Sequence, residues 1–164
     1  MRTPPGVGGV EPMWHDPAMP EPLGADDLDR IAARLPHQPP MRLIERLLAV
    51  DPGRSATALR RTSRADWFFD GHFPGAPVVP AIVLIELIAQ TGGLAAASLP
   101  GAPIGMRVAA VTGFKFPAPA GPDLDLIATA EVKGRMGPLV RVEGSVHADG
   151  TLVASGAVTL ASVE

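Results

Sequence analysis

Apolar and polar residues alternate along the last third of the chain. The alternation runs over 124–132 and 139–147, and a further apolar-rich segment, 152–160, follows the dipeptide Asp149-Gly150. A period of two is typical of strands with one buried face, and Asp-Gly favours a two-residue hairpin turn. We therefore predict strands over these three segments, with the last two joined as a hairpin.

Three earlier segments also have the composition of strands. Two of them, 42–50 and 55–63, flank Asp51-Pro52-Gly53-Arg54, whose residue types are common in turns. The third, 108–116, ends at a loop rich in proline. These segments extend the predicted sheet.

Two helices are predicted. Residues 25–34 have acidic residues in the first turn and an apolar face, and the prolines of 35–40 end this helix. Residues 79–98 are apolar on all sides, which predicts a helix enclosed by the rest of the chain. Glu86 and Gln90 argue against a membrane span there. We predict an α+β fold in which an antiparallel sheet curves around this central helix.

Composition sets limits on the organisation and the function. The chain has 164 residues, and proline and glycine crowd residues 1–24, so we expect a flexible tail followed by a single domain over 25–164. A net charge of −3 argues against a general nucleic-acid binder. The absence of cysteine excludes disulfides and thiolate chemistry. No apolar run follows Arg2, so we expect a cytoplasmic protein.

Glu86 and His72 are the candidate acid–base groups. Glu86 lies in the apolar helix one turn before Gln90, so the two share a face. A buried carboxyl must be neutral, be paired or border a cavity. His72 lies in a glycine- and proline-rich turn, beside an aromatic run that we expect to form an apolar wall around the imidazole. Either residue alone is more often structural, but together they suggest proton transfer.

The start of the central helix supplies backbone donors. The N–H groups of Ala81 and Ile82 follow Pro80 and have no partner inside the helix. They could hold a carbonyl that becomes enolate-like when its α-proton leaves, although water also caps helix ends in this way. We find no metal-ligand spacing and no phosphate-binding loop, so no cofactor or metal is expected.

Several motifs together resemble the 3-hydroxyacyl-[acyl-carrier-protein] dehydratases of type II fatty acid synthesis. The likeness extends from about residue 35 to the C-terminus, and His72 and Glu86 are 14 positions apart, as in the family. The matching segments are Leu35-Pro36-His37, Met41-Arg42-Leu43-Ile44-Glu45-Arg46, Phe68-Phe69-Asp70-Gly71-His72-Phe73-Pro74-Gly75, Pro77-Val78-Val79-Pro80, Ile85-Glu86-Leu87-Ile88-Ala89-Gln90 and Gly113-Phe114-Lys115-Phe116.

The resemblance implies a hotdog fold and a homodimer, often assembled as a trimer of dimers, with each active site shared between two subunits. His72 would remove the α-proton, Glu86 would protonate or orient the leaving 3-hydroxyl, and Gln90 would support Glu86. The substrate-binding residues that follow from it are Gly71, Phe73, Pro80, Ala81, Ile82 and Gln90.

The resemblance also implies a partner, acyl carrier protein carrying the substrate. Because this carrier is acidic, Arg60, Arg61 and Arg64 are candidates for its docking patch, although solvated arginines at a strand end would look the same. His37 is expected to be structural. Ala81 stands where the family usually has glycine. Its methyl group lies beside the expected carbonyl site and narrows it. The alternatives are a hotdog thioesterase, an enoyl isomerase, and a non-catalytic hotdog protein that binds acyl chains or serves as an assembly partner.

Overall fold

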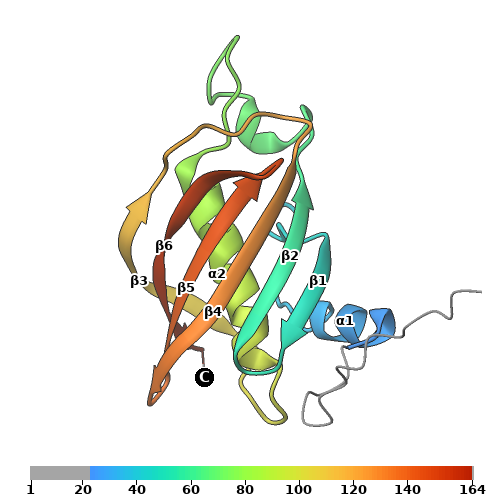
Figure 1. The fold of residues 1–164 in the computed structure, drawn as a ribbon, viewed down its shortest axis with the longest axis vertical. Helices are drawn as coiled ribbons and strands as arrows, with labels where there is room; N and C mark the ends of the chain where they lie inside the picture. The colour runs from blue at the N-terminus through green and yellow to red at the C-terminus, as the bar shows by residue number, and fades with distance from the viewer. Residues whose placement is uncertain (1–22, 164) are drawn as a thin grey trace, which may run out of the picture.

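Helix α2 (Ala81–Ala97) is the centre of the molecule, and a curved sheet wraps around it (Figure 1). The computed structural model describes residues 23–163, so the predicted tail lies almost entirely outside the described part of the chain. Most of the 17 residues of α2 are buried, and Leu87 and Ile88 are completely so. Burying a side chain of this size stabilises the fold by about 1.5–3 kcal/mol. The predicted enclosed helix is confirmed.

The sheet has six antiparallel strands in the order β1-β2-β4-β5-β6-β3. Asp149 and Gly150 both have positive φ, 44° and 82°, as a type I′ turn requires, and they join β5 to β6 in the predicted hairpin. A sheet curved around one helix is the hotdog fold that the sequence predicts. The strands are β1 (Arg46–Asp51), β2 (Ser55–Arg61), β3 (Met106–Lys115), β4 (Asp125–Met136), β5 (Leu139–Ala148) and β6 (Thr151–Ser162).

The first strand begins later than predicted. We expected it from residue 42, but β1 starts at Arg46. The Leu43 N–H donates to the side-chain Oε1 of Gln90 at 3.0 Å, and the Arg42 N–H donates to the Gln38 carbonyl at 3.0 Å. The Leu43 donor is thus bound to α2 and the Arg42 donor to a local turn, and the first backbone bond from this segment to β2 is the one from the Glu45 N–H to the Leu59 carbonyl, at 3.0 Å.

The two edges of the sheet differ. Helix α1 (Ala25–Ala32) lies beside β1 at one edge, while β3 forms the other (Figure 1). Most residues of β3 are exposed, including the apolar Val111 at 48%. An exposed edge strand carries unpaired backbone groups that can pair with another strand. Within residues 23–163, no helix is long and apolar enough to cross a membrane.

Candidate active site

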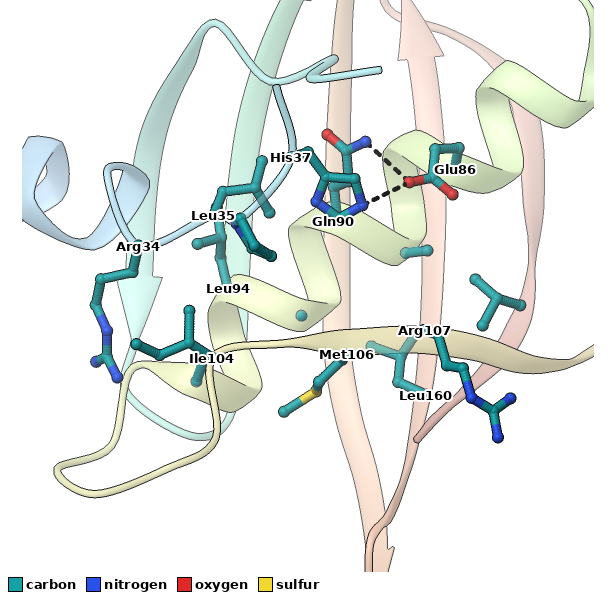
Figure 2. Close-up of a pocket in the computed structure, with 15 residues that line it drawn as sticks. Arg34, Leu35, His37, Glu86, Gln90, Leu94, Ile104, Met106, Arg107 and Leu160 are labelled. Atoms are coloured by element: carbon teal, nitrogen blue, oxygen red, sulfur yellow. Dashed lines mark hydrogen bonds and ion pairs between the residues drawn. The ribbon is translucent and has the colours of Figure 1, made fainter. Parts of the chain in front are cut away.

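A cavity of about 260 Å³ lies between α2, the segment that follows α1, and β3. Glu86 and Gln90 lie at its polar end together with His37, and Arg34 and Arg107 border it further away (Figure 2). The remainder is largely apolar, as expected of a site that holds a hydrocarbon chain. The apolar side chains that line it are Leu35, Pro36, Ala89, Leu94, Ala97, Ile104, Met106, Val108 and Leu160.

Glu86 borders this cavity with its side chain 23% exposed. Its Oε1 accepts a hydrogen bond from Gln90 Nε2 at 2.9 Å and lies 3.2 Å from His37 Nε2. Gln90 is only 2% exposed and is itself held: its Nε2 also donates to the Met41 carbonyl at 2.7 Å, and its Oε1 accepts from Leu43. Glu86 is thus both paired and beside a cavity.

His72 lies in the loop between the 3₁₀ turn Trp67–Phe69 and α2, and this loop orients its ring. Its Nδ1 is 2.8 Å from the Val78 carbonyl, and the Val78 N–H donates to the His72 carbonyl at 2.9 Å. A carbonyl oxygen only accepts, so Nδ1 carries the proton and, in the neutral ring, Nε2 keeps its lone pair. Nε2 is therefore the atom available as a base.

The four aromatic residues near His72 differ in their burial. Phe68 and Phe69 are buried in the core, at 4% and 3% exposure, whereas Trp67 and Phe73 are exposed at 47% and 54%. The Phe73 ring stacks on His72 with the centroids 4.1 Å apart. Phe68 and Phe69 belong to the core under the loop, and Phe73 is the ring that contacts the imidazole.

The start of α2 keeps its predicted donors free. Val83 and Leu84 donate to the Pro80 carbonyl, at 2.9 and 3.4 Å, while the N–H groups of Ala81 and Ile82 have no acceptor among the described residues. The Ile82 side chain is 69% exposed. The helix therefore presents two N–H donors, with the positive end of its dipole behind them, at an open surface.

The structure divides the predicted site residues into two groups. Glu86 and Gln90 line the cavity, whereas His72 is absent from its lining, and none of the hydrogen bonds of the described chain joins His72 to Glu86. Gly71 and Phe73 are exposed on the loop that carries His72, and Pro80 to Ile82 form the start of the helix. The cavity of the described chain therefore contains one member of the predicted pair, Glu86.

His37 makes a contact with the candidate acid that the sequence reasoning did not anticipate. It was expected to be structural, yet it lies beside the Glu86 carboxylate, 49 positions away in sequence. The available signal was its place in Leu35-Pro36-His37, one of the segments that carry the family resemblance.

The candidate basic patch is largely neutralised. Arg61 binds Asp125 with two hydrogen bonds, of 2.7 and 3.0 Å, and Arg60 is paired with Asp66 and lies 3.7 Å from Glu45. The hydrogen bond from Arg61 lowers the pKa of the Asp125 carboxyl below its usual value. Two of the three candidate charges are thus paired, and Arg64 is the one without an ion pair among the described residues.

Comparison with known proteins identifies the family. The model of the FabA-like domain matches residues 35–157, which is most of the chain. The chain belongs to the FabA-like family. This FabA-like chain is also 34% identical over 138 residues to the 3-hydroxyacyl-[acyl-carrier-protein] dehydratase FabZ of Polynucleobacter necessarius, an alignment that covers 84% of this chain and 93% of that protein.

Solved structures share the fold of this FabA-like protein at low sequence identity. The dehydratase heterocomplex ApeI:P from Xenorhabdus doucetiae matches with a TM-score of 0.69 at 17% identity, over 82% of this chain and 91% of that one. Zebra fish thioesterase superfamily member 2 matches with a TM-score of 0.61 at 16% identity, over 79% and 89% of the two chains. Since these neighbours include both dehydratases and a thioesterase, the likeness establishes the hotdog fold alone.

Proposed function

We propose that this protein removes water from 3-hydroxyacyl thioesters carried on acyl carrier protein and produces trans-2-enoyl thioesters, in the synthesis of fatty acids or related lipids or polyketides. The observation that carries the proposal is a carboxyl group, Glu86, held at the polar end of an apolar cavity in a FabA-like chain. The apolar part of the cavity suits an acyl chain, and the carboxyl group suits the 3-hydroxyl.

The reaction divides between two residues. His72 Nε2 takes the proton from the α-carbon, and the electrons of that C–H bond form the double bond to the β-carbon. Protonated Glu86 gives its proton to the 3-hydroxyl, so the β-carbon–oxygen bond breaks and water leaves. The N–H groups of Ala81 and Ile82 stabilise the enolate-like thioester oxygen in between.

We further propose that the active unit is a homodimer in which His72 of one protomer meets Glu86 of its partner. Three features support this: the cavity contains Glu86 without His72, β3 is an edge strand of the sheet formed by the described residues, and Ile82 and Phe73 are exposed near the two halves of the site. An exposed strand edge and exposed apolar side chains are typical of an interface between subunits.

The first test measures water loss from a 3-hydroxyacyl thioester, on acyl carrier protein and on coenzyme A, by wild type, His72→Ala and Glu86→Gln. Each substitution should lower kcat by roughly 10²–10⁴-fold, the range of general acid–base catalysis. His147→Ala, on β5 away from the cavity, is the control and should keep full activity. A folded wild type that releases free acid, or leaves both substrates unchanged, would refute the proposal.

The shared site has a separate test in mixed subunits. When unfolded His72→Ala and Glu86→Gln chains are mixed equally and refolded, half of the dimers contain one of each chain. If the site is shared, each mixed dimer has one intact site, and activity returns to about a quarter of wild type. If both groups acted within one chain, the mixture would stay as inactive as its components.

A further inference from the structure

His37 and Gln90 direct two donors at the same oxygen of Glu86. Gln90 Nε2 donates to Oε1 at 2.9 Å, and His37 Nε2 is 3.2 Å from the same atom. The second oxygen of Glu86, Oε2, receives no hydrogen bond from the described residues, and it points away from both donors (Figure 2). The two oxygens of this carboxyl group are therefore not equivalent.

The buried side of the His37 ring identifies which nitrogen carries the proton. His37 Nδ1 is buried and has no hydrogen-bond partner among the described residues. A buried N–H without a partner is rarer and more costly than a buried lone pair without one. The favoured neutral ring therefore has its proton on Nε2, where it is donated to Glu86, and leaves Nδ1 as a bare lone pair.

We propose that His37 is a positioning residue for the catalytic acid, so that Glu86 delivers its proton from Oε2. This inference rests on the proposed function. An oxygen that accepts two hydrogen bonds is a poor place for the acidic proton, which therefore resides on Oε2, beside the substrate. Gln90 alone makes a single contact about which the carboxyl group can rotate. His37 supplies a second contact from a different part of the chain and fixes the carboxyl plane.

The segment that carries His37 is anchored on both sides, as a positioning role requires. Leu35 is 5% exposed in the core, and the Arg42 side chain donates to the Ala32 carbonyl at 3.1 Å. The Arg42 N–H closes the following turn on the Gln38 carbonyl. His37 thus has a rigid base, which a group that positions an acid needs.

Two variants separate positioning from simple packing. His37→Gln keeps an N–H donor at the ε position, and His37→Phe keeps the ring volume without any donor. We expect His37→Phe to lower kcat by about 10–100-fold with little change in KM, because misplacement of a catalytic group costs rate. His37→Gln should retain most of kcat, and His147→Gln should match wild type. Equal or better activity of the phenylalanine variant would overturn the inference.

A double-mutant cycle tests whether His37 acts through Glu86. In the Glu86→Gln background, where the acid is already absent, His37→Phe should reduce the residual rate no further. The same fold-loss in both backgrounds would show that His37 acts elsewhere.

A second cycle is independent of turnover. It measures melting temperature for His37→Phe with and without Glu86→Ala, and the shift caused by His37→Phe should be smaller when Glu86 is missing. Equal shifts would refute the contact itself, whatever reaction the protein performs. Coupled shifts in a wild type without dehydratase activity would refute the proposed function and leave the contact standing.

Discussion

Replacement of Gly92 by alanine would test how closely α2 approaches the sheet. A Cβ at Gly92 would lie 2.5 Å from Val142 Cγ1 and 3.0 Å from its Cγ2, far inside van der Waals contact. Val142 is fully buried on β5, and its β-branched side chain has little freedom to rotate. At the next position, a Cβ at Gly93 would meet only Leu160 Cδ1, at an ordinary 3.9 Å.

The two substitutions share one energy term and differ in another. In a helix interior, alanine is favoured over glycine by about 1 kcal/mol, and this gain applies to both positions. Overpacking a tight core costs about 1–3 kcal/mol, and this cost applies only to Gly92. We therefore expect Gly93→Ala to stabilise by up to about 1 kcal/mol and Gly92→Ala to destabilise by about 1 kcal/mol.

Urea unfolding followed by far-UV circular dichroism measures both values, provided that all variants are compared at the same protein concentration and with equal m-values. Val142→Ala in the Gly92→Ala background removes both clashing methyl groups, so the two substitutions together should cost less than the sum of their separate effects. If Gly92→Ala is as stable as Gly93→Ala, α2 does not pack against Val142 at the short distance described above, and the reasoning is refuted.

Two further outcomes are expected. Gln90→Leu leaves the Leu43 N–H buried without an acceptor and should destabilise the protein by about 2 kcal/mol. The control, Gln38→Leu, changes an exposed side chain and should have little effect on stability. Equal urea midpoints for the two variants would contradict this expectation. Because the pKa of Asp125 is lower in the folded protein than in the unfolded chain, its pair with Arg61 stabilises the fold at pH values above the pKa that Asp125 has in the unfolded chain. This contribution is lost as the pH falls through the lower pKa that Asp125 has in the folded protein. An NMR titration should show this pKa rising in Arg61→Ala, and an unchanged pKa would argue against the pair.

Much of the fold could be predicted from local patterns. The period of two located β4 and β5, and the uninterrupted apolar composition of 79–98 predicted the enclosed helix. The hairpin at Asp149-Gly150 followed from turn chemistry. Each of these features depends on neighbours in the sequence, because backbone geometry and the alternation of side chains are local properties.

Other features required the fold. The start of β1 moved because Gln90, far along the chain, binds the Leu43 N–H and takes it away from the sheet. Two of the three candidate docking arginines proved to be paired with carboxylates. A sequence shows that such partners exist but not which of them meet.

The same distinction applies to the candidate site. The sequence by itself determined that the central helix would carry Glu86 and Gln90 on one face, since a helix brings positions four apart together. Only the tertiary structure decided that His37 lies against that carboxyl group and that His72 lies outside the cavity of its own chain. The physical reason is that contacts between distant segments depend on how strands, helix and loops pack as a whole, and no local pattern records that packing.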